Sequence, residues 1–346
     1  MFKTPKFWEV NSKINSTISF ILLPLSLLFI TGTILRKIFT TEQKLKGKFV
    51  ICIGNVTLGG NGKTPTTIAL YHALSQNFPN DVCIITKGYG RKTKGFVVAD
   101  KNINPNTNTF HIGDEPTMMV QFAPVYLFTT IKDIIKNIDK IKESVIITDD
   151  GMQNPSLYKD FTLLIIGEQL FGNGKIFPAG SLRESPRNAI KKANAVLFTG
   201  QNIISHFFST KQLMGKPHYT IKQDFTTEIL PQNEKNIIAF SGLGNNSKFK
   251  ASLERMGFTV KKFFEFPDHH QYTPREVEKI INQSNDDGNE LPIITTEKDW
   301  VKLTDSHKNR IKTLKIEYIL DTHITNQIIE EINLRKSFTN ANFYDI

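Results

Sequence analysis

Lys63 and Thr64 close a glycine-rich turn that follows a short apolar run, Val50 to Ile53. An apolar strand, a glycine-rich turn and a helix start, in this order, are the elements that hold a nucleotide triphosphate. Backbone N–H groups surround the phosphates, the lysine neutralises their charge, and the threonine hydroxyl is a ligand for Mg²⁺. The sequence therefore predicts a phosphate-binding loop for ATP and Mg²⁺. The residues predicted to contact the nucleotide are Thr57, Gly59, Gly60, Asn61, Gly62, Lys63, Thr64 and Pro65.

This loop departs from the usual pattern G-x-x-x-x-G-K-[ST], because Thr57 stands where the first glycine belongs. The additional glycines, Gly59 and Gly60, fall inside the loop instead. The alternative is a turn whose glycines serve only a tight change of direction. The strand before the loop, the helix after it and the Gly-Lys-Thr sequence at their junction favour phosphate binding.

Two neighbouring carboxylates, Asp149 and Asp150, end a second apolar run, Val145 to Thr148. Ligands bind at the carboxyl edge of parallel sheets. One of these aspartates is therefore placed to hold Mg²⁺, directly or through water, opposite the hydroxyl of Thr64. A turn rich in Asp and Gly is the alternative, and the neighbouring phosphate loop favours the metal site.

A basic turn with two glycines follows the apolar residues 84–86 and contains Lys87, Tyr89 and Arg91. Such a turn either binds the phosphate of a substrate or forms a flexible hairpin. The positive charge that it brings to the presumed active edge of the sheet favours substrate binding.

Two further segments carry polar groups for which the residues alone favour a structural role over a functional one. Asp114 and Glu115 precede Pro116, which is good helix-start chemistry by itself. Arg183 and Glu184 lie in a long loop, where they either stabilise a transferring phosphoryl group and join the metal shell or form a surface salt bridge.

The pair His269 and His270 invites a metal interpretation, but no cysteine or further histidine is spaced to complete a zinc site. A histidine that reaches into a cleft between domains and acts on a proton is the alternative. The polar run 295–299, which ends an apolar strand, either binds nucleotide or caps a helix.

The elements that must position these groups alternate between strands and helices, which predicts a P-loop NTPase-like, mostly parallel α/β sheet with a second, smaller α/β domain. The expected strands are 49–53, 82–86, 125–128, 145–148, 162–166 and 195–198, and then a second series that begins near Tyr219 and contains 237–241, 259–264, 292–295 and 317–320. The expected divisions are an N-terminal membrane helix (1–36), a kinase core (37–219), a smaller domain (220–325) and a C-terminal segment that packs back on the core (326–346).

The charge of the chain limits the classes of partner that it could bind. The chain has 346 residues and a formal net charge of +10, which favours anionic lipid, phosphorylated substrates or nucleic acid as partners. No nucleic-acid-binding motif accompanies the charge, so we expect a lipid surface and phosphate, and no nucleic acid. The abundance of Lys, Asn and Ile throughout the chain is a competing, compositional explanation. Cys52 and Cys83 lie in apolar runs, which indicates buried thiols in a reducing compartment.

Residues 14–35 carry no formal charge, and a helix of this length spans a bilayer. A cleaved signal peptide is the main alternative, but its apolar region should be shorter and end at small residues. A helix lying in the interface is a third possibility, because Ser19, Ser26 and Thr33 recur every seven residues. The phosphate loop needs cytosolic ATP, so we expect a single anchor in the inner membrane with the remaining chain in the cytosol.

Taken in order, the motifs resemble those of the tetraacyldisaccharide 4′-kinase (lipid A 4′-kinase) family. They comprise the N-terminal helix, the Gly-Asn-x-Thr-x-Gly-Gly-x-Gly-Lys-Thr-Pro loop, Gly-Tyr-Gly-Arg, Gly-Asp-Glu-Pro, Asp-Asp-Gly-x-Gln, Pro-x-Gly-x-Leu-Arg-Glu, Asp-His and Thr-Glu-Lys-Asp. Each is weak alone, but eight in order along nearly the whole chain are specific. The resemblance implies transfer of the ATP γ-phosphate to the 4′-hydroxyl of a tetraacylated glucosamine disaccharide 1-phosphate, giving lipid IVA, by a monomer at the cytosolic face of the inner membrane.

The resemblance also implies roles for individual residues. Asp114 matches the proposed general base and His269 its partner, and His269 is preferred to His270 because the motif is Asp-His. Lys63 and Arg183 match the catalytic cations. Lys87, Tyr89, Arg91 and Glu115 are the residues expected to bind the substrate, although many members have Arg in place of Lys87. The residues implied around the metal are Thr64, Asp149, Asp150 and Glu184.

Two other classes stay open on the residues alone. One is a membrane-tethered ATPase that switches a protein partner, which stimulation of hydrolysis by protein would support. The other is a catalytically silent binding module on a membrane surface, which failure to bind nucleotide would support.

Overall fold

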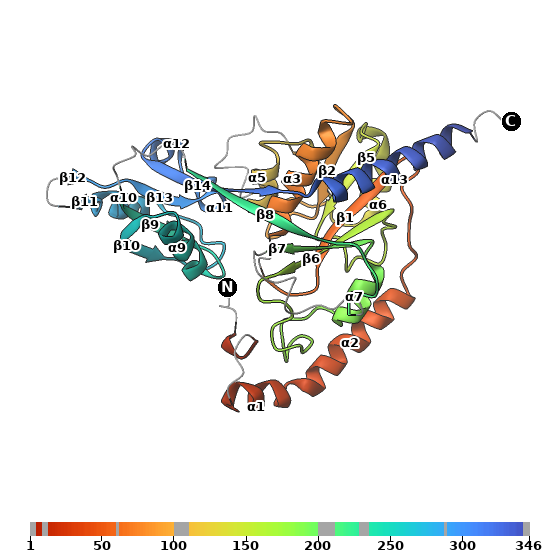
Figure 1. Cartoon of the computed structure of the whole chain (residues 1–346), viewed down its shortest axis with the longest axis horizontal. Coiled ribbons are helices and arrows are strands. Elements are labelled where there is room, and N and C mark those ends of the chain that lie inside the picture. The colour runs from red at the N-terminus through yellow and green to blue at the C-terminus, as the bar shows by residue number, and fades with distance from the viewer. Residues whose placement is uncertain are drawn as a thin grey trace.

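The fold is built on one sheet of 12 strands in the order β10-β9-β13-β14-β8-β7-β6-β1-β5-β2-β4-β3 (Figure 1). The structure is a computed structural model that describes residues 5–8, 13–59, 62–99, 111–199, 212–227, 235–286 and 289–341. The strands of the sheet are β1 (Phe49–Asn55), β2 (Val82–Thr86), β3 (Val97–Ala99), β4 (Val125–Leu127), β5 (Val145–Asp149), β6 (Phe161–Gly167), β7 (Ala195–Thr199), β8 (His218–Thr227), β9 (Asn236–Ser241), β10 (Thr259–Glu265), β13 (Ile293–Thr296) and β14 (Ile311–Ile319).

Neighbouring strands run parallel in every pair of this sheet except β8–β14 and β3–β4. The mostly parallel α/β sheet predicted from the sequence is therefore confirmed. β1, which leads into the glycine-rich loop, lies between β5 and β6 and is buried along its whole length.

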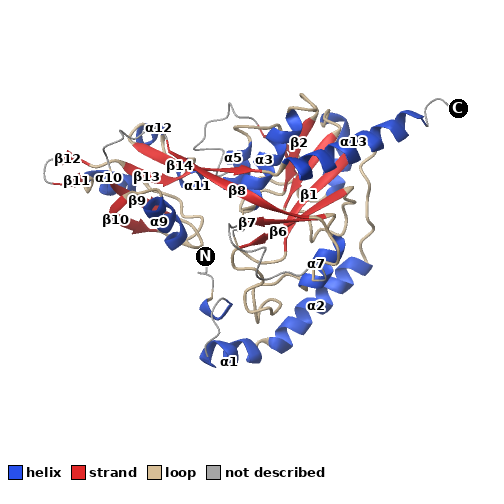
Figure 2. Ribbon diagram, in the orientation of Figure 1, coloured by secondary structure: helices blue, strands red, loops and turns tan. Residues whose placement is uncertain are grey.

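Helices cover both faces of the sheet, as expected where strands are apolar on both sides (Figure 2). Side chains of a strand alternate between the faces: Ile51 and Ile53 of β1 join one hydrophobic cluster, and Val50 and Cys52 join two others. The helices of this part of the chain are α3 (Lys63–Ser75), α5 (Asp114–Met119), α6 (Ile131–Lys136), α7 (Pro186–Lys192) and the short 3₁₀ helix η2 (Ile138–Lys140).

Residues 235–319 form the other end of the sheet, where β9 separates two further hydrophobic clusters. One cluster contains Val277 and Ile280 of α10, and the other contains Phe249 and Leu253 of α9. The helices and the small hairpin of this part are α9 (Asn246–Arg255), α10 (Pro274–Asn282), α11 (Glu297–Trp300), α12 (Asp305–Lys308), β11 (Asn285–Asp286) and β12 (Asn289–Glu290).

β8 joins the two ends of the sheet (Figure 1). Its first residues pair with β7 in parallel as far as Ile221, and its residues from Lys222 onward pair with β14 in the antiparallel direction. The chain then returns through β14 to the C-terminal helix α13 (Thr322–Ala341), which packs on α3. Ile324, Ile328 and Ile332 of α13 belong to the same hydrophobic cluster as β1.

The N-terminal apolar segment is two helices rather than one. After the 3₁₀ helix η1 (Lys6–Trp8), α1 (Lys13–Ile21) and α2 (Leu23–Ile38) meet at a bend of 50° between Ile21 and Leu23. Pro24 has no N–H to donate to the preceding turn, and its ring conflicts with the carbonyl four residues before it. Among the described residues no single helix is long and apolar enough to cross a membrane, although this bent pair has the required length and composition when taken together.

Two strands differ from the prediction. β14 begins at Ile311, six residues before the predicted start at Glu317, because Ile311, Thr313 and Leu314 pair with β13 and are buried. The edge strand β3 was not predicted, since its three residues have no extended apolar run.

Candidate active site

The glycine-rich loop lies between the carboxyl end of β1 and the start of α3. Gly62 is the residue before the helix and has φ of +80°, a conformation that glycine adopts without strain. Nζ of Lys63 donates to Oδ1 of Asn55 at 3.3 Å and lies 3.9 Å from Oδ1 of Asp150. Thr64 is buried one residue further along the helix. The predicted nucleotide ligands Gly60 and Asn61 lie outside the described residues.

The segment around Leu182 supports this loop from the side. The backbone N–H of Leu58 donates to the carbonyl of Ser181 at 2.7 Å, and that of Arg183 donates to the carbonyl of Val56 at 2.6 Å. Thr57 and Leu182 form an isolated antiparallel bridge between these two contacts. The loop residues 56–58 are therefore held as an extended strand, and Arg183 is brought beside them.

The two carboxylates at the end of β5 face different partners. Asp149 is buried and accepts a hydrogen bond from Oγ1 of Thr67 at 3.2 Å. Burial, and after it the negative charge of Glu115, raises the pKa of Asp149, while Lys63 lowers it. Asp150 has φ of +52° and pairs with Nη1 of Arg183 at 2.7 Å.

Glu184 also lies at this edge of the sheet. Its Oε1 accepts from Nε2 of Gln153 at 3.3 Å, and its Oε2 pairs with Lys192. Nε2 of Gln153 also donates to the carbonyl of Asn55 at 2.8 Å, which ties this group to β1.

The predicted metal residues offer the oxygen ligands that Mg²⁺ prefers. Asp149 is a buried carboxylate whose pKa is raised, as expected for an acid whose burial outweighs the attraction of the nearest cation. Thr64 lies in the first turn of α3, and Asp149 ends β5, the strand next to β1. The donor set therefore fits Mg²⁺, although the described residues contain no group of three or more His, Cys, Asp or Glu that could hold a metal ion without further ligands.

A second cluster joins residues that are far apart in the chain. Nδ1 of His269 donates to Oδ2 of Asp114 at 2.8 Å, across 155 positions of sequence. Nζ of Lys298 lies 3.3 Å from Nε2 of the same histidine and donates to Oδ1 of Asp268 at 3.0 Å. Nζ of Lys302 lies 3.3 Å from the same Asp114 oxygen.

Asp114 is buried at the start of α5, and its partners decide its protonation. Burial alone would raise its pKa, but the hydrogen bond from His269 and the charge of Lys302 more than offset this, so the pKa lies below its ordinary value. His269 has φ of +58°, which is uncommon for a residue with a side chain and is typical of functional sites. The arrangement provides an ionised carboxylate, fixed in direction and able to accept a proton.

Of the predicted substrate residues, Tyr89 and Glu115 adjoin this cluster, whereas Lys87 and Arg91 have other neighbours. The ring of Tyr89 is 68% exposed, and its centroid is 5.8 Å from that of His269. Lys87 is exposed, and desolvation together with the charge of Arg36 lowers its pKa. Arg91 has a different environment, because its Nη2 donates to the carbonyl of Gly95 at 2.9 Å and to Thr129 at 3.1 Å.

Three residues of this site were not predicted. Asn55 belongs to the glycine-rich loop motif but had no role assigned from the sequence, and Lys298 belongs to the run 295–299, whose role was left open. Lys302 was missed altogether. The signal that could have found it is a lysine inside the apolar sequence Trp300-Val301-Lys302-Leu303, since a buried lysine requires a partner. In the same run Thr296 accepts from the backbone N–H of Asp299, so this segment does cap a helix.

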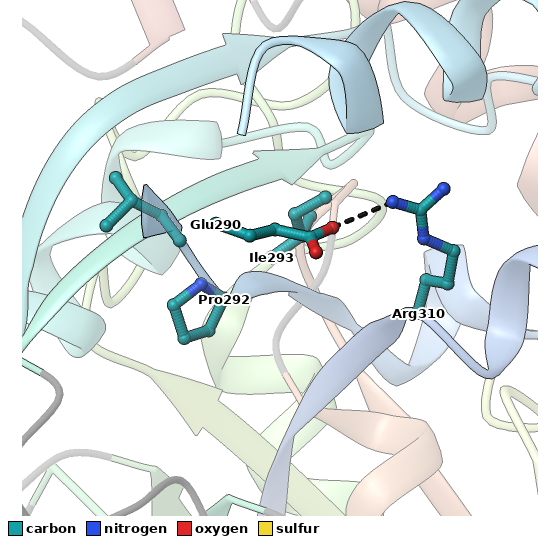
Figure 3. A pocket seen from close by; sticks show the side chains of 5 residues that line it. Glu290, Pro292, Ile293 and Arg310 are labelled. Carbon is teal, nitrogen blue, oxygen red and sulfur yellow. Dashed lines mark hydrogen bonds and ion pairs between the residues drawn. The ribbon is translucent and has the colours of Figure 1, made fainter. Parts of the chain in front are cut away.

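The pocket drawn in Figure 3 is a separate feature. It has a volume of about 260 Å³, and Glu290 and Arg310 form an ion pair of 2.7 Å in its wall. It lies at the start of β13, whereas Thr296 and Lys298 follow the other end of that strand.

Known proteins resemble this chain over almost its whole length. The family profile described as tetraacyldisaccharide-1-P 4′-kinase (LpxK) matches residues 18–333. A protein named tetraacyldisaccharide 4′-kinase from Rickettsia canadensis is 34% identical over 310 residues, which are 88% of this chain and 90% of the relative. One of the same name from Rickettsia akari is 32% identical over 330 residues, 92% of this chain and 94% of the relative.

The crystal structure of LpxK from Aquifex aeolicus in complex with ATP superimposes with a TM-score of 0.72 at 28% sequence identity. The match covers 90% of this chain and 99% of that one. The family predicted from the motifs is thereby confirmed, and the chain belongs to the tetraacyldisaccharide-1-phosphate 4′-kinases, a family of lipid-sugar kinases.

Proposed function

We propose that this kinase transfers the γ-phosphate of ATP to the 4′-hydroxyl of a tetraacylated glucosamine disaccharide 1-phosphate and so produces lipid IVA. The observation that carries the proposal is the contact of Asp114 with His269, which lies beside the phosphate-binding loop and its carboxylates. The ATP complex of the Aquifex aeolicus relative supports ATP as the donor.

The nucleotide side of the reaction needs positioning and neutralisation of charge more than covalent chemistry. Lys63 and the loop N–H groups bind the phosphates, and Arg183 stabilises the charge that develops on the transferring group. Mg²⁺, when bound, would neutralise part of the triphosphate charge. The residues proposed to hold it are Thr64, Asp149, Asp150 and Glu184.

The proton of the attacking hydroxyl goes to the carboxylate of Asp114. As the O–H bond breaks, the sugar oxygen forms a bond to the γ-phosphorus, the bond to the β-γ bridging oxygen breaks, and ADP leaves. His269 holds the carboxylate in place from the other end of the sheet. Closure of the two ends around ATP would therefore complete the site.

The substrate side is proposed to use the exposed residues around this carboxylate. Lys87 and Tyr89 are exposed, Tyr89 lies beside His269, and the two side chains are suited to a phosphate and a sugar ring. Glu115, next to the base, is proposed to accept hydrogen bonds from sugar hydroxyls. Arg91 shapes the turn through its contacts with Gly95 and Thr129, and in addition adds positive charge for the 1-phosphate.

The bent pair α1–α2 is proposed to attach the enzyme to the cytosolic face of the inner membrane. Its polar side faces the protein, where Oγ of Ser19 donates to the carbonyl of Ala179 at 2.9 Å and Oγ of Ser26 donates to that of Ile176 at 2.7 Å. Its other side is apolar and exposed; the exposed side chains include Phe20, Ile21, Leu25, Leu27, Leu28, Ile34, Leu35, Ile38 and Phe39.

This attachment agrees with an acylated substrate, because the acyl chains remain in the bilayer while the sugar reaches the site. The chain's net charge of +10 adds attraction to an anionic surface. We propose that the enzyme acts there as a monomer.

The decisive experiment measures transfer of labelled γ-phosphate from ATP and Mg²⁺ to tetraacyldisaccharide 1-phosphate in detergent micelles. We expect labelled lipid with the natural chain and none with Lys63→Ala or Asp114→Ala. Near-normal transfer by Asp114→Ala would remove this residue as the base. Hydrolysis of ATP without labelled lipid would instead support the membrane-tethered ATPase, and absence of nucleotide binding would support the silent module.

A further inference from the structure

Lys302 is a completely buried lysine that the proposed chemistry has not used. Its side chain is 0% exposed, and its Nζ lies between two carboxylates, 3.3 Å from Oδ2 of Asp114 and 3.2 Å from Oδ1 of Asp299. Burial of a lysine is costly unless its charge is paired. The single positive charge of Lys302 therefore contacts two carboxylates, of which one, Asp299, would be enough to pair it. The second contact brings this charge to Asp114.

Hydrogen bonds from two other residues fix the side chain of Asp299. It is fully buried, and its Oδ2 accepts from the backbone N–H of Gly242 at 2.9 Å and from Oγ1 of Thr296 at 2.7 Å. Since these donors belong to two strand ends of one hydrophobic unit, β9 and β13, the position of Asp299 is set by the fold. Lys302, three residues later, is therefore held in a fixed direction toward Asp114.

His269 and Lys302 make different contributions to Asp114. Nε2 of His269 lies 3.3 Å from the ammonium of Lys298, which can only donate to it, so the proton of a neutral imidazole is on Nδ1. His269 orients the carboxylate through this hydrogen bond. Lys302 adds the charge of its ammonium group, whose Nζ lies 3.3 Å from Oδ2 of Asp114.

Both partners use the same oxygen of the carboxylate. The contacts of His269 and Lys302 are to Oδ2, and no described group donates to Oδ1. Oδ2 is thus held by two residues from the other end of the sheet, and Oδ1 remains available to accept a proton.

We propose that Lys302, anchored by Asp299, is a positioning residue that holds Asp114 ionised and exposes its Oδ1 to the attacking hydroxyl. The inference rests on the proposed function and extends it to a residue without substrate contact. Burial of Asp114 and the approach of a negatively charged triphosphate both favour its protonation, and Lys302 opposes both. The other groups that face Asp114 electrostatically are His269, Lys298 and Tyr272, and Glu115 neighbours it in the chain.

The test compares the pH dependence of kcat for Lys302→Met, Lys302→Arg and a matched control, Lys308→Met. Lys308 is also a lysine with a 9% exposed side chain, and it pairs with the aspartate three residues before it, Asp305, at 3.3 Å. Its described contacts do not include Asp114 and its partner is exposed, so the control removes a lysine and its i,i−3 ion pair from the same part of the chain without touching Asp114.

Loss of a positive charge beside Asp114 raises its pKa, so the acidic limb of the kcat profile of Lys302→Met should move to higher pH by about one unit or more. We expect kcat on this acidic limb, below both pKa values, to fall about tenfold relative to the natural chain for each unit by which the pKa rises, with recovery toward the natural value at about pH 7 to 9 and an unchanged KM for ATP. Lys302→Arg should keep the natural profile to within about threefold, as should Lys308→Met.

A loss of activity that is equal at all pH values, with a lowered Tm, would mean that Lys302 only stabilises the fold and would overturn the proposal. If Lys302→Met does not fold, the double variant Lys302→Met/Asp299→Asn is compared with Asp299→Asn, so that the two proteins differ only at Lys302 and the same rise in the pKa of Asp114 is tested. If the natural chain labels no lipid, the proposed function fails by itself. The inference is then judged by NMR of the carboxyl carbon of Asp114, whose pKa must rise in Lys302→Met and stay in place in Lys308→Met.

Discussion

His269 and His270 are adjacent in the chain but have different environments. His269 contacts Asp114 and Lys298, whereas the ring of His270 stacks on Phe266 with centroids 4.7 Å apart and its Nε2 lies 3.3 Å from Glu276. The first histidine therefore faces the site, and the second packs within its own part of the fold.

We expect His269→Ala to lower kcat by about 100-fold or more, because an oriented acid–base pair contributes on that order. His270→Ala should lower kcat by less than about fivefold and should mainly lower the Tm. Steady-state phosphoryl transfer and thermal unfolding of both variants make the comparison. Equal losses of kcat at matched stability would show that the choice between the two histidines is wrong.

The contacts of this site join residues that are far apart in the chain, so the sequence alone did not predict them. The residues alone favoured a structural role for Asp114 and left the histidine pair open, and only the resemblance to a family joined them. Nothing local in the sequence indicates that residues 155 positions apart meet. Lys302 was missed for the same reason, because its partners include a residue on the far side of the site.

Among the elements, the junction of β1 and α3 depends on a glycine for two reasons. Gly62 has φ of +80°, and a Cβ there would lie 2.7 Å from Cε2 of Tyr318, a residue of β14. Oη of Tyr318 accepts a hydrogen bond from Gln223 of β8 at 3.2 Å, so this tyrosine cannot move aside freely. The end of the glycine-rich loop therefore rests against the two strands that lead to the other end of the sheet.

Gly62→Ala should weaken ATP binding about tenfold or more, since a left-handed residue with a side chain costs about 1–2 kcal/mol before the contact with Tyr318 is counted. Gly59→Ala is the matched control, because Gly59 also has a positive φ, +116°, but a Cβ added to it would meet no atom within 4 Å. Calorimetric titration with ATP measures the affinity of each variant. The same loss in the two variants would mean that backbone strain alone matters.

The C-terminal helix is attached to the sheet by an ion pair as well as by its isoleucines. Nζ of Lys336 in α13 lies 2.7 Å from Oδ2 of Asp81, next to β2. Burial would raise the pKa of Asp81, but the hydrogen bonds from Lys336 and Ser144 lower it below its ordinary value.

A carboxylate whose pKa is lowered on folding stabilises the fold above its unfolded pKa, and this contribution disappears as the pH falls through the folded pKa. We expect Lys336→Met to reduce the free energy of unfolding by no more than about 1 kcal/mol at pH 7, because both side chains are partly exposed. The difference from the natural chain should vanish in acid, below the lowered pKa of Asp81 in the folded protein. Urea unfolding at both pH values tests this, and a difference that persists in acid would exclude the ion pair as its cause.

The strands of the core were predictable because each is an apolar run that ends at a turn rich in glycine or aspartate, as β1 and β5 do. The start of β14 and the break between α1 and α2 were not, because they depend on which surface the segment contacts. Ser19 and Ser26 were noted for their spacing, but only the fold shows that they contact the carbonyl groups of Ala179 and Ile176.

At the scale of the whole molecule, we expect the exposed apolar side of α1–α2 to attach the protein to membranes. Replacing Phe20, Leu27, Leu28 and Ile38 by serine should lower binding to anionic lipid vesicles about tenfold or more, since each buried CH₂ group contributes about 0.8 kcal/mol. These side chains are 64–69% exposed, so the fold should be retained. The control replaces Val98 and Leu334, which are exposed elsewhere, and vesicle flotation is the measurement. Unchanged flotation of the first variant would rule out this side of the helices as the attachment surface.

The path of the chain has a consequence for the order in which the protein forms during synthesis. The cluster around β1 needs Ile324, Ile328 and Ile332, and these follow the entire 235–319 segment. A nascent chain therefore exposes its apolar N-terminal helices first, while the hydrophobic cluster around β1 stays incomplete until Ile332 has been added. Early capture of the N-terminus by a lipid surface or a chaperone would protect the chain through that interval.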